Sequence, residues 1–142
     1  MYDTNIKGTI TELKVLTYFL EHECMVSVPQ SPCRYDFILE HKNNLYRVQT
    51  KTSRLNNTKE CIIFSTESSR QVNGKCIHET YENDNIDYFC TMYEDECYLI
   101  PIEDCGRGEK KLRLCPTKNG QVKNIYFAKD YIAIDVLSRL NK

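Results

Sequence analysis

Four polar residues of this chain have the types and the spacing needed to hydrolyse a phosphodiester bond. Glu12 ends the segment GTITE, Asp36 ends RYD, and Gln49 and Lys51 lie in VQTK. Carboxylate and amide oxygens are ligands that a hard cation such as Mg²⁺ prefers. A lysine beside such a cation can help to deprotonate an attacking water and can offset charge that develops on a phosphate. The residue types therefore predict a cation site of Glu12, Asp36 and Gln49, with Lys51 next to it.

Two other kinds of hydrolytic site fit the sequence less well. A sugar hydrolase would use a pair of carboxylates without a lysine between them. No Ser-His-acid set is visible, and no glycine-rich loop that could surround a phosphate is present either. Phosphodiester hydrolysis remains the chemistry that the four residues favour.

An amphipathic helix is expected from residue 8 to about residue 23. Its apolar side chains recur at helical spacing, at positions Leu13, Leu16, Phe19 and Leu20. At about 100° per residue, Glu12 falls inside this apolar stripe and faces the protein, where an unpaired carboxylate would cost several kcal/mol. One interpretation is that Glu12 belongs to a site; the alternative is a capping box in which Glu12 bonds the amide of Thr9.

A hairpin is expected to bring Asp36 to the same face as Gln49 and Lys51. The segments YDFILEH and LYRVQTKT flank a KNN turn, and asparagine tolerates the positive φ of tight turns. With Asn43–Asn44 as the turn, Asp36 would lie opposite Lys51, and Glu40 opposite Arg47, which removes Arg47 from the site. The alternative is an exposed sheet face with an Asp36–Lys51 salt bridge, which stabilises little.

The remaining patterns predict one α+β domain over residues 1–142, with a central sheet and helices packed against it. Further strands are expected at CMVSVP, at ECIIFST, on both sides of an acidic turn in IDYFCTMYEDECYLIPI, and at KKLRLCP. Tyr131–Leu140 is expected to close the fold as a helix. The polar segment from residue 67 to residue 85 is expected to be a loop, with or without a short helix.

Charge is segregated along the chain although the net charge is only −1. Residues 41–59 contain lysine and arginine but no acid, residues 79–104 contain acids but no lysine or arginine, and residues 107–123 are mostly basic. Such blocks can form separate basic and acidic faces, so the net charge is a weak objection to a polyanionic partner. Solvated loops with uneven charge are the alternative interpretation.

The composition also bears on the cellular compartment. No apolar run approaches the roughly 18 residues of a membrane helix, and the first ten residues lack the apolar core of a signal peptide. A cytoplasmic protein without a membrane partner is therefore expected. The eight cysteines contain no C-x-x-C pair, so we expect mostly reduced, partly buried thiols rather than a structural metal.

The helix Glu, the strand Asp and the Gln-x-Lys of the next strand together resemble the PD-(D/E)XK nuclease superfamily. Tyr35 stands where the family name has proline, and Gln49 stands where it has an acid. Gln-x-Lys resembles the variant of a subgroup of group I intron-encoded homing endonucleases, and NIDYFCTMYEDECYLIPIED resembles a segment of the same subgroup. The resemblance implies a central mixed sheet flanked by helices.

The resemblance also implies an activity, a cofactor and partners. The implied activity is that of a site-specific endonuclease for double-stranded DNA, and the implied cofactor is Mg²⁺ or Mn²⁺. The implied partners are DNA and further copies of the chain, in a homo-oligomer, dimer or tetramer, in which each active subunit cuts one strand. Glu12 and Asp36 would ligate the metal, Gln49 would orient metal or water, and Lys51 would activate water. The residues expected to contact DNA are Arg54, Lys59, Ser69, Arg70 and Lys75.

Other functions remain open on sequence grounds. A stand-alone DNase, such as a junction resolvase or a restriction-type enzyme, could use the same residues on another DNA shape. Gln49 also suits a catalytically silent nuclease-fold module that binds DNA or protein. A scaffold without any nucleic-acid role is a third possibility, and DNA binding that weakens steeply with salt would argue against it.

Overall fold

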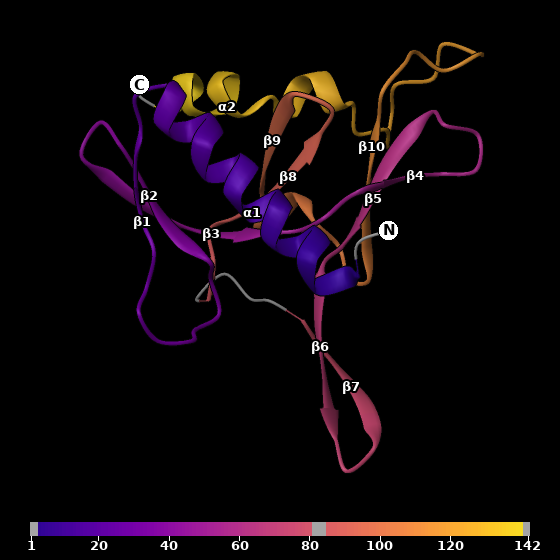
Figure 1. Ribbon diagram of the computed structural model, residues 1–142. Helices are drawn as coiled ribbons and strands as arrows, with labels where there is room; N and C mark the ends of the chain where they lie inside the picture. Colours follow the sequence, from indigo (N-terminus) through magenta and orange to yellow (C-terminus); the bar gives the residue numbers. More distant parts are fainter. Residues whose placement is uncertain (1–2, 81–84, 141–142) are drawn as a thin grey trace.

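A five-stranded mixed sheet forms the centre of the computed structural model (Figure 1), which describes residues 3–80 and 85–140, without the side chains of residues 68–72, 77, 78 and 80. The strands lie across the sheet in the order β1 (Met25–Ser27), β2 (Phe37–His41), β3 (Asn44–Thr50), β8 (Tyr88–Tyr93) and β9 (Glu96–Pro101). Strands β3 and β8 run parallel, and every other neighbouring pair is antiparallel.

The two faces of this sheet are covered by different layers. On one face, Phe37, Leu39 and Val48 pack with helix α1 (Thr4–Glu21) and helix α2 (Ala133–Arg139). On the other face, Phe89 and Ile100 pack against a second sheet with the order β10 (Glu109–Arg113), β5 (Cys61–Ser65) and β4 (Arg54–Leu55). The α+β class and the central mixed sheet are therefore confirmed, and both α-helices cover the same face.

The expected helix near residue 8 begins earlier and buries a different face. Asp3 caps α1 because its Oδ1 accepts a hydrogen bond from the amide of Ile6 at 2.9 Å. The capping box of Thr9 and Glu12 is therefore wrong, since these residues lie well inside the helix. The buried residues of α1 are Thr11, Val15, Tyr18 and Phe19.

Two leucines that were expected in the core lie on the outside of α1. Leu13 is 58% exposed and Leu20 is 54% exposed, whereas Phe19 is completely buried. The sequence pattern contained two apolar stripes on one helix, and its periodicity alone did not show which of them faces the sheet. Tertiary packing against β3 and β8 selects the stripe of Val15 and Phe19.

The hairpin of β2 and β3 turns one residue earlier than expected. Lys42 and Asn43 are the turn residues, with φ of 49° and 68°, and His41 pairs with Asn44. The predicted Asn43–Asn44 turn is therefore wrong, and the register differs from the expected one by two residues. Because side chains alternate faces with a period of two, a two-residue shift leaves Asp36, Gln49 and Lys51 on the same side.

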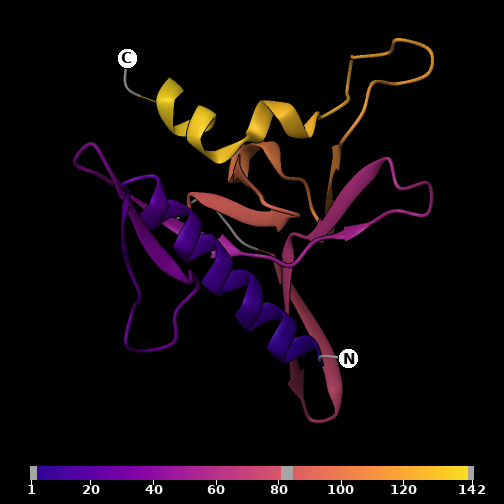
Figure 2. The ribbon, with the colours of Figure 1, turned by 45° about the horizontal axis from the view of Figure 1, so that its top comes forward.

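A two-stranded arm extends away from both sheets, as Figure 1 and the turned view in Figure 2 show. It consists of β6 (Glu67–Val72) and β7 (Lys75–Thr80), joined by a tight turn in which Asn73 and Gly74 both have positive φ. The prediction of a loop or short helix is wrong for this segment, because the Asn-Gly turn closes a hairpin. Residues 81–84 of the expected loop lie outside the described part of the chain.

The other predicted strands are confirmed, and the predicted C-terminal helix needs correction. Strands β1, β5, β8, β9 and β10 lie where they were expected, and β4 was missed. The expected helix Tyr131–Leu140 is divided, because the 3₁₀ helix η2 (Ala128–Tyr131) ends at Tyr131 and α2 begins at Ala133. A separate 3₁₀ helix, η1 (Ile102–Asp104), follows β9. None of the described helices is long and apolar enough to cross a membrane. All eight cysteines are free thiols, and four of them are buried.

Candidate active site

Asp36 lies at the start of β2 and is held against the end of β3. Its amide donates to the carbonyl of Val48 at 2.9 Å, and its Oδ2 accepts from the amide of Thr50 at 2.8 Å. The register of the hairpin places Asp36 beside Gln49, and not directly opposite Lys51 as expected. The main chain of β3 therefore fixes one oxygen of this carboxyl group.

Glu12 reaches Asp36 from helix α1. The two carboxyl groups share a side-chain hydrogen bond in which a protonated Glu12 donates to the carboxylate of Asp36. Burial raises the pKa of Glu12, and the charge and hydrogen bond of Asp36 raise it further. Burial also raises the pKa of Asp36, although the Thr50 amide, Glu12 and Lys51 oppose this effect.

Lys51 lies directly after β3, beside the parallel strand β8. Its amide donates to the carbonyl of Cys90 at 2.8 Å, which extends the β3–β8 ladder. Its Nζ donates at 2.9 Å to the carbonyl of Glu67, the first residue of the arm. Burial lowers the pKa of Lys51, whereas the nearby carboxylate of Asp36 raises it.

Gln49 supplies a neutral side chain to the same side of the hairpin. Its Nε2 lies 3.5 Å from the carbonyl oxygen of Thr50, at the limit of a hydrogen bond. With Nε2 in this orientation, the amide oxygen is the atom left for a cation. The structure thus brings together Glu12, Asp36, Gln49 and Lys51.

The chemistry of these groups fits a hard divalent cation. Two neighbouring carboxyl groups with raised pKa values repel each other when both are ionised, and a cation between them would relieve that repulsion. In the part of the chain that the structure describes, no three side chains among His, Cys, Asp and Glu cluster as a metal site. A cation here would therefore be held by Glu12, Asp36, the Gln49 oxygen and water, an oxygen set that suits Mg²⁺.

Arg34 is a cation near the site that the sequence interpretation missed. Its charge lowers the pKa of Lys51, so its guanidinium lies within electrostatic reach of that ammonium group. Its Nη1 forms an ion pair with Glu79 of β7 at 3.6 Å. The only sequence signal for Arg34 is its position two residues before Asp36. Arg47, by contrast, lies opposite Ile38 of β2 and not opposite Glu40 as expected, and its Nη2 pairs with Asp87 at 3.2 Å.

The expected DNA contacts occupy three different places. Arg54 of β4 forms an exposed ion pair with Glu109 at 2.6 Å, and Lys59 lies exposed in the turn between β4 and β5. Figure 1 shows β4 and β5 on the opposite side of the molecule from β2. Lys75 is exposed at the start of β7. Ser69 and Arg70 belong to β6, and their side chains lie outside the described part of the structure.

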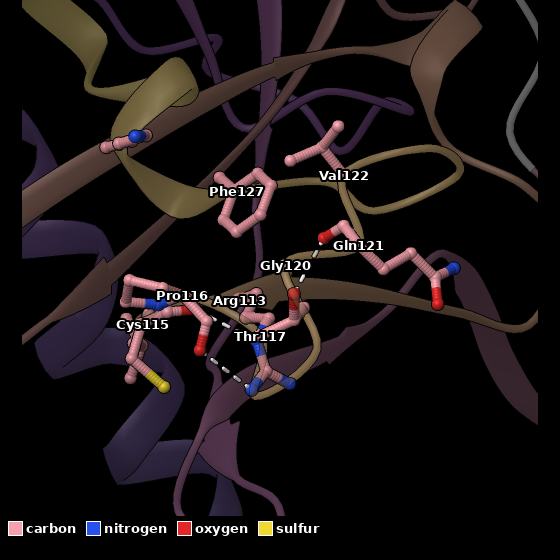
Figure 3. Close-up of a pocket in the computed structure, with 10 residues that line it drawn as sticks. Arg113, Cys115, Pro116, Thr117, Gly120, Gln121, Val122 and Phe127 are labelled. Carbon is pink, nitrogen blue, oxygen red and sulfur yellow. Dashed lines mark hydrogen bonds between the residues drawn. The ribbon is translucent and has the colours of Figure 1, made fainter.

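A cavity of about 310 Å³ lies elsewhere, in the loop that follows β10 (Figure 3). Phe127 and Val122 face it, and Arg113 closes one side by donating to the carbonyl of Pro116 at 3.2 Å. No carboxylate lines this cavity. It therefore lacks the donors of a cation site and is separate from Glu12 and Asp36.

Residues 2–134 match the PD-(D/E)XK endonuclease family, and the chain therefore belongs to that family. Among solved structures, the fold is similar to that of a bacterial homing endonuclease, I-Ssp6803I, with a TM-score of 0.77 and 17% sequence identity. This similarity covers 97% of the present chain and 95% of the homing endonuclease. No curated protein matches the sequence significantly.

Proposed function

We propose that this chain is a divalent-metal-dependent endonuclease that cuts double-stranded DNA at specific sites. The observation that carries the proposal is the contact between the Glu12 and Asp36 carboxyl groups beside Lys51, in a chain of the PD-(D/E)XK endonuclease family. The whole chain, residues 1–142, would act as a single nuclease domain. The similar fold of a homing endonuclease supports a homing-type enzyme.

Glu12, Asp36 and the Gln49 oxygen would hold Mg²⁺ or Mn²⁺. When bound, the cation supplies a Lewis acid that polarises the scissile phosphate and lowers the pKa of a bound water. Asp36 is kept in place by the Thr50 amide at Oδ2, so Oδ1 is the oxygen that would bind the cation. Gln49 adds an oxygen without adding a third negative charge.

Lys51 would hold the attacking water and stabilise the charge that develops on the phosphate. Burial lowers the pKa of Lys51, so its ammonium group releases a proton more readily than that of an exposed lysine. Its hydrogen bond to Glu67 fixes the direction of the side chain. Arg34, whose charge acts on Lys51, would offer a second positive charge to the same phosphate.

The DNA would lie across the site and along the arm. A two-stranded β-ribbon has dimensions that fit the major groove, and the arm starts at the residue that binds Lys51. Ser69, Arg70 and Lys75 would contact DNA from the arm, and Arg54 and Lys59 from β4 and its turn. Phosphate contacts by these cations would give affinity that falls with salt.

Cutting both strands needs two copies of a site that holds one scissile phosphate, so a homo-oligomer is part of the proposal. The second candidate function is a silent nuclease-fold module that binds DNA without cutting it. Gln49 favours this candidate, because an amide binds a divalent cation more weakly than a carboxylate does. A resolvase-type or restriction-type DNase would differ in its DNA target and not in its site.

A cleavage assay separates these functions. Purified protein and its Lys51→Ala variant are incubated with mixed plasmid DNA and Mg²⁺, with Lys118→Ala as a control because Lys118 is exposed and far from the site in sequence. We expect parent and control to cut equally and Lys51→Ala to cut at least about 100-fold more slowly. Equal cutting by the parent and Lys51→Ala, or no cutting with any divalent metal, would overturn the proposal.

A further inference from the structure

Helix α1 carries a second apolar stripe on its outer face. Ile6, Leu13 and Leu20 are 46%, 58% and 54% exposed and lie seven residues apart, so they form one line along the helix. Ile10 and Thr17 lie between them, which completes the alternating four-three spacing of a coiled-coil seam. At 100° per residue this seam lies on the side of α1 that faces away from Val15 and the central sheet.

A groove runs beside this seam. It has a volume of about 490 Å³ and is lined by Ile10, Leu13 and Thr17 of α1 and by Met92, Glu94 and Asp95 of β8 and its turn. Lys14 and Glu21 of α1 line it as well, so the groove has an apolar floor and a rim that carries both charges. Such a surface, apolar at the centre and charged at its edge, is typical of a protein interface.

The charges next to the seam show which partner fits. Lys7, Lys14 and Glu21 form the neighbouring row of α1, again seven residues apart. In an antiparallel pair of identical helices, this row faces the same row of the other helix. Lys7 then lies opposite Glu21 of the second copy, and Glu21 lies opposite Lys7 of the second copy.

The same geometry favours the antiparallel direction over the parallel one. Lys14 lies near the centre of the row, where Glu94 and Asp95 of the groove can offset the approach of two lysines. In a parallel pair, the charged row would face the row of Thr9 and Leu16, which carries no charge. The α1 surface is thus complementary to itself under a twofold axis.

We propose that the α1 seam is the interface between two copies of this chain, packed antiparallel with the twofold axis near Leu13. This inference rests on the proposed function, because cutting both strands needs two sites, and it assigns the surface that joins them. The contact would bury Ile6 of one copy against Leu20 of the other and would cover Leu13 of both.

The first test is the oligomeric state of Leu13→Lys, measured by sedimentation over a range of concentrations. Leu45→Lys is the matched control, since Leu45 is 63% exposed on β3 and lies outside the seam. We expect dimers for the parent and Leu45→Lys, and a dissociation constant at least about 100-fold higher for Leu13→Lys. A parent that stays monomeric, or a Leu13→Lys variant that dimerises like the parent, would overturn the inference.

The second test exchanges charges and does not depend on the packing of Leu13. Lys7→Glu and Glu21→Lys each place like charges opposite one another and should weaken dimerisation, by about tenfold. The double variant Lys7→Glu with Glu21→Lys restores opposite charges and should recover the parent affinity. Additive weakening in the double variant would contradict the antiparallel arrangement.

A third measurement separates this inference from the proposed function. Lys51→Ala should still dimerise without cutting, whereas Leu13→Lys should still nick plasmid DNA in Mg²⁺ but should form fewer linear products. Loss of cutting in every protein, including the parent, would count against the nuclease activity alone. Linear products formed by Leu13→Lys at the parent rate would count against the interface alone.

Discussion

Glu12 and Asp36 hold two carboxyl groups in contact, and this contact shapes the stability of the protein without metal. Burial raises the pKa of both groups, and the charge and hydrogen bond of Asp36 raise the pKa of Glu12 further. Each group therefore contributes stability below its ordinary pKa, near 4, and this contribution is lost as the pH rises through its raised pKa. At neutral pH the two carboxylates repel each other, and a bound cation would reduce this repulsion.

Glu12→Gln should stabilise the metal-free protein at pH 7. The amide can still donate a hydrogen bond to Asp36, and the repulsion between two carboxylates is gone. We expect an increase of about 0.5 to 1 kcal/mol in the free energy of unfolding, because Glu12 is partly exposed to solvent and the repulsion is screened. Denaturation at pH 7 and below pH 4 measures this effect, which should vanish at the lower pH.

The same variant provides its own control with metal. Mg²⁺ binds the native state of the parent and should raise its stability by mass action, but it should raise that of Glu12→Gln much less. The difference in the free energy of unfolding between the two proteins at pH 7 should therefore become smaller or change sign in Mg²⁺. Equal stabilisation of both proteins by Mg²⁺ would show that Glu12 does not bind the cation.

Gln49→Glu tests whether the amide limits metal affinity. A third carboxylate should lower the Mg²⁺ concentration for half-maximal cleavage by about tenfold, equivalent to about 1.4 kcal/mol. The same variant should be less stable than the parent without metal, because it adds a charge beside Asp36. Gln49→Ala serves as the opposite control and should raise the Mg²⁺ requirement; an unchanged requirement in both variants would exclude Gln49 from the site.

At the scale of elements, the arm joins the expected DNA surface to the candidate catalytic lysine. Glu67 starts β6 and accepts the hydrogen bond of Lys51, while Glu79 of β7 pairs with Arg34. The base of the arm is therefore held by two cations of the site. DNA bound along the arm would come close to both of them.

Arg70→Ala and Lys75→Ala should weaken DNA binding without changing the cation site. Each lost phosphate contact should reduce the slope of log affinity against log salt by about 0.9. Binding to duplex DNA at several salt concentrations measures this slope, with Lys118→Ala as the control. A slope that equals that of the parent in both variants would exclude the arm as a phosphate-binding element.

The β2–β3 turn offers a stability test that is independent of function. Lys42 and Asn43 both have positive φ, which is unfavourable for lysine and is best supplied by Asn-Gly. Lys42→Asn combined with Asn43→Gly should raise the free energy of unfolding by about 1 kcal/mol. Thermal denaturation would detect this change, and a decrease in stability would contradict the observed turn.

The elements also show what local sequence patterns could and could not predict. The strands at Cys61–Ser65 and Tyr88–Tyr93 could be predicted from apolar runs. Asp36, Gln49 and Lys51 were also correctly predicted to share one side of the hairpin, because the error in the turn shifts the register by two residues. The choice between the two stripes of α1 depends on tertiary packing, which periodicity does not contain. Arg34 likewise could not be predicted, because a loop brings it near the site and no sequence motif marks it.

At the scale of the whole molecule, the fold brings three separate segments to one place. Helix α1 supplies Glu12, the chain directly before β2 supplies Asp36, and the end of β3 beside β8 supplies Gln49 and Lys51. The opposite face of the central sheet is covered by β4, β5 and β10 and has no part in this site. The outer surface of α1 is the proposed contact with a second copy.

The decisive measurement for the cation site is the rate of DNA cleavage against Mg²⁺ concentration, for the parent and for Asp36→Asn. Asp36→Asn keeps the shape of the side chain and the hydrogen bond from the Thr50 amide, but it removes the charge that would hold the cation. We expect cleavage by the parent that saturates with Mg²⁺ and stops in a chelator, and a rate at least about 1000-fold lower for Asp36→Asn. Cleavage by the parent that persists in the chelator, or an Asp36→Asn variant that cuts at the parent rate, would contradict the assignment of this site.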